Sequence, residues 1–461
     1  MQWSKSLKPE ALSRGAVALE ILAIEVGSTI TKANGFRRRP EGDFEHLAQG
    51  FAPTSVAAGD VGLGVDLALA DLQASSGLQI RDAQIFVNSS AAGGLRMTVH
   101  GLTYSMTARA AREAALGAGA IVKLVTAGRL SDSDLEEIRS IRPNIILLAG
   151  GVDYGEKEVI LRNAESLASL KLNVPVLYAG NFAIRAPVRK IFAVAGIETL
   201  LADNVFPDVD VLNIEPVRRL IHEVFNHHIV HAPGMARLGE LTQWSILPTP
   251  GAVLRGAELF AETLGDCLIL DVGGATSDVH SVTDGSLEWG PKMIEPEPRA
   301  KRTVEGDLGV YINARNIVDL SGEPTWEARL PDLQALPKTK QQLELTRWLC
   351  TRAVETAIRR HAGVITDLFT PSGKKQIVKG KDLTAVKWLV GTGGALTRIP
   401  GGEAILRLIC QNPGRYLLPP PDVRILIDRD YRFSALGTLA QAYPEEVKAT
   451  FRSWVESETP P

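Results

Sequence analysis

The sequence predicts an α/β protein with two lobes, and three observations lead to this class. The chain has 461 residues, of which 45% are hydrophobic and 22% charged, so it is long enough to bury several cores. From residue 120 to residue 230, short apolar runs alternate with amphipathic helical stretches, as in successive βα units. Apolar runs at three distant places end in glycine-rich turns, around residues 27, 273 and 393. Such turns let a backbone approach a ligand closely.

The expected first lobe spans residues 16–250. It opens with a buried strand at Ala18–Val26, followed by a tight turn and a second strand over residues 27–33. The inserted βα units come next, and two of their strands end in Ala149-Gly150-Gly151 and Ala179-Gly180-Asn181. We expect these glycines to mark the carboxyl edge of a sheet.

The expected second lobe spans residues 251–445, and residues 446–461 are expected to form a tail. A hairpin is predicted over Cys267–Val282, and helical patterning runs from Leu349 to Phe369. The run Lys387–Gly394 predicts a strand that enters a glycine turn.

Charge and composition exclude several functions. The 50 basic and 53 acidic side chains give a formal charge of −3, which lacks the basic excess of proteins that track phosphate backbones. Nucleic acid is therefore not an expected partner. The 3 cysteines are odd in number and far apart, which favours a reducing compartment over a disulfide framework. They are Cys267, Cys350 and Cys410.

The apolar stretch near the N-terminus is the only candidate for a targeting segment. It runs from Ala16 to Val26 but is interrupted by Glu20 and Glu25, so a buried strand accounts for it better than a signal peptide. No run reaches the length of about 18 apolar residues that a membrane span requires. The expected location is cytoplasmic, with no membrane partner.

The three glycine-rich turns carry the chemistry. Successive backbone N–H groups in such turns can form an anion-binding nest, and adjacent hydroxyls add short donors. Together, and in this order, two hairpins that face each other would hold the phosphates of a nucleotide, while the late turn would hold its nucleoside end. The candidate nucleotide-binding residues are Gly27, Ser28, Thr29, Lys32, Gly273, Gly274, Thr276, Gly391, Gly393 and Gly394.

An acidic residue precedes each of the first two turns, Glu25 and Asp271. Mg²⁺ keeps most of its waters and is usually held by one or two carboxylates plus phosphate oxygens. Both carboxylates are therefore candidate metal ligands that would hold Mg²⁺ through water, and both are candidate catalytic residues. Asp271 is the first choice for orienting the attacking water, with Glu25 opposite.

This arrangement resembles the actin-like ATPase superfamily, whose fold is two-lobed and ribonuclease H-like with an interlobe nucleotide cleft. The resemblance assigns Glu25–Lys32 to the first phosphate loop, Asp271–Asp278 to the second and Leu389–Ala395 to the adenosine loop. No Gly-x4-Gly-Lys-Ser/Thr motif occurs in the sequence. The nearest dinucleotide pattern, Gly62-x-Gly64, has Leu67 where a third glycine belongs.

A closer resemblance is to the accessory proteins encoded beside glutamate mutase (methylaspartate mutase) and other cobalamin-dependent aminomutases. It extends over most of the chain, and its last stretch is quite specific. The matching stretches are Gly27–Lys32, Leu148–Asp153, Leu270–Val279 and Arg302–Gly309.

The resemblance implies an ATP-dependent reactivating chaperone that uses Mg-ATP and acts on the subunits of an adenosylcobalamin-dependent mutase. A small-molecule kinase of the same fold and a nucleotide-gated scaffold without hydrolysis are the alternatives. One residue departs from the superfamily pattern, because Glu25 stands where Asp is usual. Its longer side chain would crowd the metal, so the sequence predicts a slow ATPase.

A histidine-rich stretch at His222–His231 is a weaker candidate for a metal site. His227 and His231 are spaced i, i+4 on a predicted helix, a spacing that can ligate zinc. The pattern is not His-Glu-x-x-His, so we interpret the stretch as the polar face of a helix.

Overall fold

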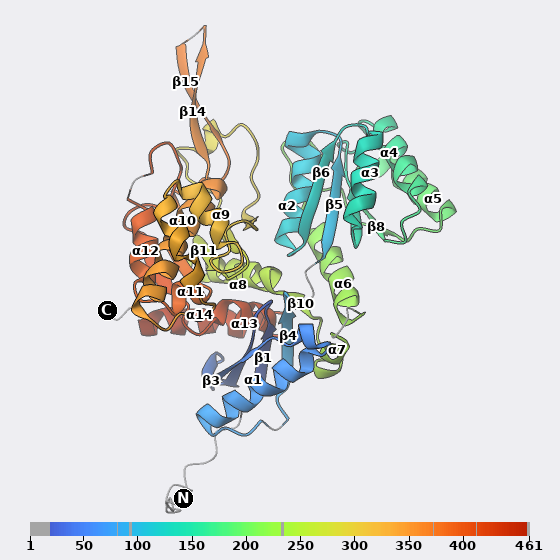
Figure 1. Ribbon diagram of the computed structural model, residues 1–461. Helices are drawn as coiled ribbons and strands as arrows, with labels where there is room; N and C mark the ends of the chain where they lie inside the picture. The colour runs from blue at the N-terminus through green and yellow to red at the C-terminus, as the bar shows by residue number, and fades with distance from the viewer. Residues whose placement is uncertain are drawn as a thin grey trace, which may run out of the picture.

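The computed structural model describes residues 19–80, 82–91, 95–231, 235–371, 373–411 and 413–458. The first residues of the expected first lobe, 16–18, therefore lie outside the described residues. Figure 1 shows three bodies: a small lobe at the bottom, an inserted domain at the upper right and a larger lobe at the left. Among the described residues, no helix is both long and apolar enough to cross a membrane.

The first lobe is a mixed five-stranded sheet in the order β10-β4-β1-β2-β3. Strand β2 runs antiparallel to β1 and β3, while β4 and β10 run parallel to β1. Helix α1 packs on the sheet against β2 and β3. The elements are β1 (Ile21–Val26), β2 (Ile30–Arg38), β3 (Phe44–Pro53), α1 (Val61–Ser76), β4 (Gln84–Ser89) and β10 (Leu247–Pro248).

The chain between β4 and β10 forms the inserted domain, which has a parallel sheet in the order β6-β5-β7-β8-β9. Glycines 150 and 180 lie just past β7 and β8, so the expected carboxyl edge is confirmed. The elements are β5 (Arg96–Gly101), α2 (Arg109–Gly117), β6 (Ile121–Ala127), α3 (Asp132–Ile141), β7 (Ile145–Leu148), α4 (Glu158–Ser169), β8 (Val176–Tyr178), α5 (Arg185–Val194), β9 (Thr199–Leu201), α6 (Glu215–His231) and α7 (Ala236–Leu241).

The second lobe repeats the topology of the first. Its sheet has the order β13-β12-β11-β16-β17, with β12 antiparallel to β11 and β13 and with β16 and β17 parallel to β11. The hairpin expected over Cys267–Val282 is confirmed as β11 and β12. The elements are β11 (Cys267–Val272), β12 (Ser277–Val282), β13 (Ala300–Glu305), α9 (Ala314–Ser321), α10 (Lys340–His361), β14 (Val364–Thr370), β15 (Gly373–Lys379), β16 (Trp388–Thr392), α11 (Gly394–Thr397), α12 (Gly402–Ile409) and β17 (Arg424–Ile427).

Two helices cross between the sheets of the two lobes, α8 (Thr249–Leu264) and α13 (Arg432–Leu439). They share one apolar core with both lobes, in which Phe86 of the first lobe and Trp388 of the second are buried. The helices pack closely because Gly437 faces the backbone of Ala252, where a Cβ would lie 1.8 Å from the carbonyl oxygen. The expected boundary at residues 250 and 251 falls inside α8.

The helix expected in the second half of the chain is too long. The helix expected from Leu349 to Phe369 ends at His361, and Val364–Thr370 forms strand β14 instead. Ala362 and Gly363 break the helix, since the N–H of Gly363 bonds the Lys381 carbonyl rather than continuing the helical pattern.

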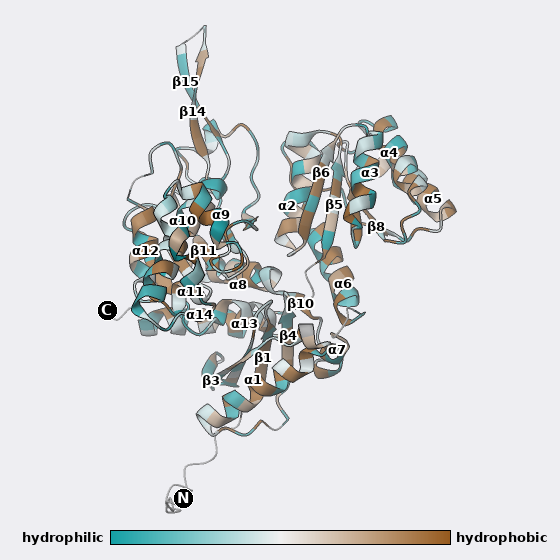
Figure 2. Ribbon diagram, viewed as in Figure 1, coloured by the Kyte–Doolittle hydropathy of each residue, from teal (hydrophilic) through white to brown (hydrophobic). Residues whose placement is uncertain are grey.

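The tail expected over residues 446–461 is wrong up to Glu458, the last residue that the structure describes. They continue helix α14 (Pro444–Glu458), whose apolar face, including Phe451 and Trp454, is buried in the core between the lobes. Figure 2 shows this alternation of hydrophobic and hydrophilic helix faces through both lobes. Burial of an amphipathic face stabilises a helix that composition alone would leave frayed.

Candidate functional site

The first two glycine turns have the same backbone geometry. The N–H of Gly27 donates to the Ile30 carbonyl at 3.1 Å, and the N–H of Gly273 donates to the Thr276 carbonyl at 2.9 Å. Each turn joins the first two strands of its lobe, β1 to β2 and β11 to β12. The two loops are therefore equivalent elements of a repeated fold.

The residues that precede each turn pair across their hairpins in the same register, Glu25 with Lys32 and Asp271 with Asp278. The repeated register thus places a lysine beside Glu25 and an aspartate beside Asp271. Lys32 lowers the pKa of Asp271 and Glu25 raises it, so the two hairpins lie close enough for their charges to interact. The structure brings together the acidic residues that the sequence singled out.

Glu25 is buried and already has two partners. Its Oε1 accepts a hydrogen bond from Lys32 Nζ at 2.6 Å, and its Oε2 accepts one from Ser434 Oγ at 2.5 Å. The Lys32 ammonium also lies 3.9 Å from the centroid of the Tyr431 ring. Burial lowers the pKa of Lys32, but Glu25 and Tyr431 raise it by more, so the ammonium is held charged. Glu25 thereby ties β1 to helix α13.

Asp271 has the opposite electrostatic setting. Burial raises the pKa of its carboxyl to about 7, and repulsion from Asp278 adds to this against the opposing effect of Lys32. Its Oδ1 lies against Gly393, where a Cβ would be only 2.5 Å away. Lys32 lowers this pKa by less than burial and repulsion from Asp278 raise it. The second loop and the late turn converge on the carboxyl group.

The late turn follows β16, and its three glycines have different surroundings. Gly393 has a φ of +83° and no space for a side chain, and a Cβ on Gly391 would press into Leu406. Gly394 is exposed, and a Cβ there would meet only the Tyr431 hydroxyl oxygen at 3.8 Å. Only Gly394 of this turn therefore faces open space.

Asp428, a buried residue that the sequence analysis missed, anchors the late turn. It follows β17 and accepts hydrogen bonds from the N–H groups of Arg432 at 2.7 Å and Phe433 at 3.1 Å, which cap helix α13. Thr392 Oγ1 donates to the same carboxylate at 3.2 Å. Burial raises the pKa of Asp428 to about 6 despite these bonds. An acidic residue directly after an apolar strand was the signal that could have revealed it.

The stretch Arg302–Gly309 supports the second loop from behind. A Cβ on Gly309 would lie 2.3 Å from the Ala275 backbone, and the Val310 N–H donates to the Gly273 carbonyl at 3.2 Å. The Arg302 guanidinium donates to Asp278 Oδ1 through Nε at 2.9 Å and Nη2 at 2.6 Å. Asp278 Oδ2 accepts a hydrogen bond from Thr276 Oγ1 at 3.2 Å, so the Arg302–Gly309 stretch reaches the second loop through Asp278.

The same arginine connects the loop to the inserted domain. Arg302 Nη1 donates at 2.9 Å to the carbonyl of Leu116, at the end of α2. Both side chains are buried. A continuous chain of contacts therefore runs from Thr276 in the second loop to the inserted domain.

The remaining candidates lie away from this cluster. Ser28 is exposed at the tip of the first loop, where its hydroxyl donates to the Ser90 carbonyl at 3.4 Å. His227 and His231 are exposed on α6. Cys267, Cys350 and Cys410 are buried.

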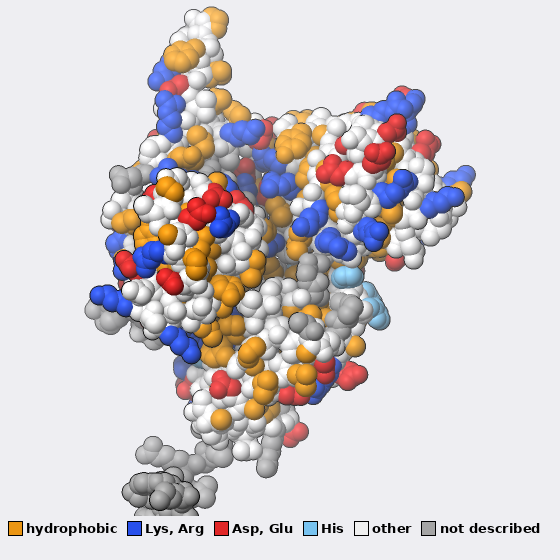
Figure 3. Space-filling model, in the orientation of Figure 1, with side chains coloured by type: hydrophobic (Ala, Val, Ile, Leu, Met, Phe, Trp, Pro, Cys, Tyr) orange, Lys and Arg blue, Asp and Glu red, His pale blue; other side chains and the backbone are white. Residues whose placement is uncertain are grey.

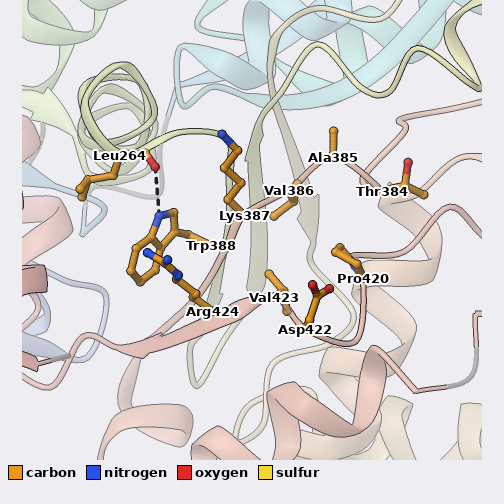
Figure 4. A pocket seen from close by; sticks show the side chains of 10 residues that line it. All are labelled: Leu264, Thr384, Ala385, Val386, Lys387, Trp388, Pro420, Asp422, Val423 and Arg424. Atoms are coloured by element: carbon orange, nitrogen blue, oxygen red, sulfur yellow. Dashed lines mark hydrogen bonds between the residues drawn. The ribbon is translucent and has the colours of Figure 1, made fainter. Parts of the chain in front are cut away.

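A cavity of about 490 Å³ lies at the opposite, amino edge of the second lobe's sheet, beside Lys387 and Arg424 (Figure 4). Arg424 lies over the Trp388 ring at 5.2 Å, and the Trp388 indole N–H donates to Leu264. In Figure 4 the Lys387 ammonium extends away from Asp422 and Arg424, so the polar groups do not converge on a common point.

The fold and the site together define a class. Two sheets of the same ribonuclease H-like order, with equivalent acidic hairpins facing each other and two helices crossing between them, make this a protein of the actin-like ATPase fold. The family model described as "MutL protein" matches residues 21–455. The chain belongs to that family.

A curated relative and several solved structures are similar to this chain. Protein MutL of Clostridium tetanomorphum is 34% identical over 470 residues, which cover 94% of this chain and 98% of the relative. A nucleotide-free acetone carboxylase structure is 14% identical, with a TM-score of 0.41 and coverage of 92% of this chain and 70% of that one. Component A of the Acidaminococcus fermentans (R)-2-hydroxyglutaryl-CoA dehydratase is 11% identical, with a TM-score of 0.30 and coverage of 93% and 99%. The strand orders of the two lobes, rather than these superpositions, identify the fold.

Proposed function

We propose that this protein is an ATP-dependent reactivating chaperone for an adenosylcobalamin-dependent mutase such as glutamate mutase, with Mg-ATP bound between the lobes. The observation that carries the nucleotide site is the pair of equivalent hairpins, which present Glu25 and Asp271 to each other across the lobes. The partner is inferred from the resemblance of the motif stretches, most specifically Arg302–Gly309.

The residues present fit a hydrated Mg²⁺ at Asp271 rather than at Glu25. Glu25 already has the Lys32 ammonium at 2.6 Å, whereas burial and repulsion from Asp278 raise the pKa of Asp271 to about 7. When bound, Mg²⁺ would neutralise negative charge on the phosphates. Asp271 would hold a metal-bound water and orient the water that attacks the terminal phosphate.

The other candidate residues bind and position the nucleotide. Gly274 of the second loop offers backbone close to the phosphates, and the Thr276 hydroxyl adds a donor. Gly394 leaves room for the nucleoside end. Glu25 holds Lys32 in place and bonds Ser434 of α13. The bond to Ser434 therefore depends on the position of the first lobe relative to α13. Positioning and charge supply most of the stabilisation in phosphoryl transfer, so no covalent step on the protein is required.

Substitution of the exposed glycine tests the nucleotide site without disturbing the fold. Gly394→Val places a side chain in open space, unlike Gly393→Val, which would clash with Asp271. We expect Gly394→Val to weaken Mg-ATP binding by about tenfold or more, which is about 1.4 kcal/mol. The matched control is Gly290→Val, another exposed glycine with no heavy atom within 4 Å of its Cβ position.

Calorimetric titration with Mg-ATP measures the affinity of each variant, and thermal unfolding verifies that each is folded. Equal affinity in a folded Gly394→Val protein would contradict the cleft assignment. A mutase inactivated by turnover should regain activity with the wild-type protein, ATP, Mg²⁺ and fresh adenosylcobalamin. Recovery that does not require ATP would contradict the chaperone proposal, and phosphate transfer to an added alcohol would favour a kinase.

A further inference from the structure

The hairpin of β14 and β15 projects from the second lobe as an isolated two-stranded ribbon (Figure 1). Its base is fastened to the lobe: the Ile365 N–H donates to the Arg415 carbonyl at 2.8 Å, and the Ile294 N–H donates to the Val378 carbonyl at 3.1 Å. Two-stranded hairpins are only marginally stable alone in water. An extended ribbon that a lobe holds away from its body therefore needs an explanation beyond folding.

Both faces of the distal part carry an apolar side chain beside a lysine. The cross-strand pairs are Leu368 with Lys375 on one face and Phe369 with Lys374 on the other, since successive strand residues point to opposite faces. Leu368 is 46% exposed and Phe369 is 79% exposed. Figure 2 shows hydrophobic and hydrophilic residues side by side along the hairpin. Large exposed apolar side chains of this kind mark interaction sites.

The charge of the ribbon is positive. Between Val364 and Lys379 it carries three lysines and one carboxylate, Asp367. Asp367 pairs with Lys374 at 3.1 Å and also with Arg415 at 2.9 Å, so one acid is shared by two cations. Lys375 is exposed. The complementary surface is therefore acidic with apolar pockets.

The base of the hairpin and the inserted domain share one acidic partner, Glu295. Glu295 lies 3.7 Å from Lys379 of β15 and 2.5 Å from Arg109, the first residue of α2. The hairpin thus stands beside the inserted domain at the same end of the molecule, and Figure 3 shows a hollow in the outline between them. A partner held by the hairpin would lie next to a domain that emerges from the other lobe.

We propose that the β14–β15 hairpin is the docking arm for the protein partner and inserts into a groove of that partner that carries carboxylates between apolar pockets. The inference rests on the proposed function, because the partner is the mutase to be reactivated. Since the arm belongs to the second lobe and the neighbouring domain is inserted in the first, a change in lobe separation would act on the bound partner.

The test compares binding of a purified mutase, subunit by subunit, by two folded variants. Leu368→Ser/Lys375→Glu alters one face of the arm, far from the candidate nucleotide residues. Leu320→Ser/Lys338→Glu is the matched control, since Leu320 is 54% exposed on α9 and Lys338 is exposed in the same lobe. We expect the arm variant to bind the mutase about tenfold or more weakly and to reactivate it poorly, with Mg-ATP affinity unchanged. Wild-type binding should also weaken as salt is raised.

The outcomes separate the docking arm from the proposed function. If the wild-type protein reactivates the mutase and the arm variant binds and reactivates equally well, the docking assignment is wrong and the chaperone function stands. An equal loss in the control variant would also overturn the assignment. If the wild-type protein binds no mutase subunit with or without ATP, both the arm and the proposed function are overturned.

Discussion

Asp271 and Glu25 occupy equivalent positions of a repeated hairpin but have different neighbours, and the roles that we propose for them rest on this difference. Lys32 opposite Glu25 supplies a positive charge, whereas Asp278 opposite Asp271 supplies a negative one. Asp278 is itself paired with Arg302 at 2.6 Å. Asp271 is thus the carboxylate whose charge the protein compensates less, and we propose that a metal ion compensates it.

The raised pKa of Asp271 predicts how its substitution changes stability with pH. Its ordinary value is 3.8 and its folded value is about 7, so the folded protein binds this proton more tightly than the unfolded chain does. The stability that Asp271 contributes at low pH is lost as pH rises from about 4 to about 7. Asp271→Asn should therefore melt about 4 °C higher than the wild-type protein near pH 8, and the difference should vanish near pH 4.

Thermal unfolding across this range, with and without Mg²⁺, measures the effect. Mg²⁺ should stabilise the wild-type protein near pH 8 and leave Asp271→Asn unchanged, because the metal competes with the proton for the same carboxylate. A variant that melts lower than the wild type at every pH would show that Asp271 is compensated by the protein itself.

At the scale of elements, the two lobes are joined by the crossing of α8 and α13. Helix α13 begins where Asp428 caps it, and it carries Ser434, which bonds Glu25 of the first lobe. Helix α8 approaches it through Gly256, where a Cβ would lie 2.8 Å from the Phe433 carbonyl oxygen. The two helices are therefore in close backbone contact where they cross.

Filling this crossing should destabilise the protein sharply. A Cβ at residue 437 would lie 1.8 Å from the Ala252 carbonyl oxygen, which is rigid helix backbone. We expect Gly437→Ala to cost about 3 kcal/mol through overpacking, although alanine favours helices by up to about 1 kcal/mol over glycine. Denaturant unfolding provides the measurement.

Gly239→Ala in α7 is the control, because that glycine is exposed and its Cβ would meet only the Val230 side chain, at 3.2 Å. It should leave stability unchanged or slightly raised. Equal stability of Gly437→Ala and the wild type would mean that the helices can separate at no cost.

At the scale of the whole molecule, Arg302 joins the second glycine-rich loop to the inserted domain. It is buried between Asp278, which bonds Thr276, and the Leu116 carbonyl at the end of α2. Arg218 of α6 adds a parallel contact by donating to the Ala300 carbonyl at 2.7 Å. The second loop, where we propose that Thr276 contacts the nucleotide, is therefore physically connected to the inserted domain.

Removing the Arg302 charge should weaken this connection and the fold. Arg302→Met leaves Asp278 buried without its cation, which we expect to cost about 3–5 kcal/mol. Hydrogen exchange should show α2 opening more readily. The double variant Arg302→Met/Asp278→Asn should recover part of the loss, since no unpaired charge remains.

An exposed ion pair of the same length is the control. Arg315 contacts Glu327 at 2.6 Å, as Arg302 contacts Asp278, but its side chain is 66% exposed. Arg315→Met should cost under about 1 kcal/mol, because solvent screens the pair. Similar losses of stability in Arg302→Met and Arg315→Met would contradict the view that burial makes the Arg302 ion pair more important than an exposed one.

Much of the site is local in sequence and could therefore be predicted. The two hairpins and their acidic residues each lie within about eight consecutive residues, where turn chemistry and strand periodicity act directly. The partners of those residues could not be predicted. Ser434 and Tyr431 reach Glu25 and Lys32 from the other end of the chain, and no local pattern announces a contact across about 400 residues.

Two elements show where local sequence patterns fail to predict the structure. Val364–Thr370 was expected to continue a helix, yet it pairs with β15 because the lobe holds the base of the hairpin. Helix α14 was expected to be a tail, yet Phe451 and Trp454 bury it between the lobes. In both cases, contacts made by distant residues override the local preference.

The sequence by itself determined the fold class, because the order of strands and helices can be followed along the chain. It also determined the three glycine turns, the acidic residues before two of them and the stretch Arg302–Gly309, since each of these consists of consecutive residues. Only the tertiary structure decided how far a cation compensates each carboxylate, which glycine of the late turn faces open space and how the second loop reaches the inserted domain. Those properties depend on burial and on neighbours that come together only when the two lobes and the inserted domain pack against one another.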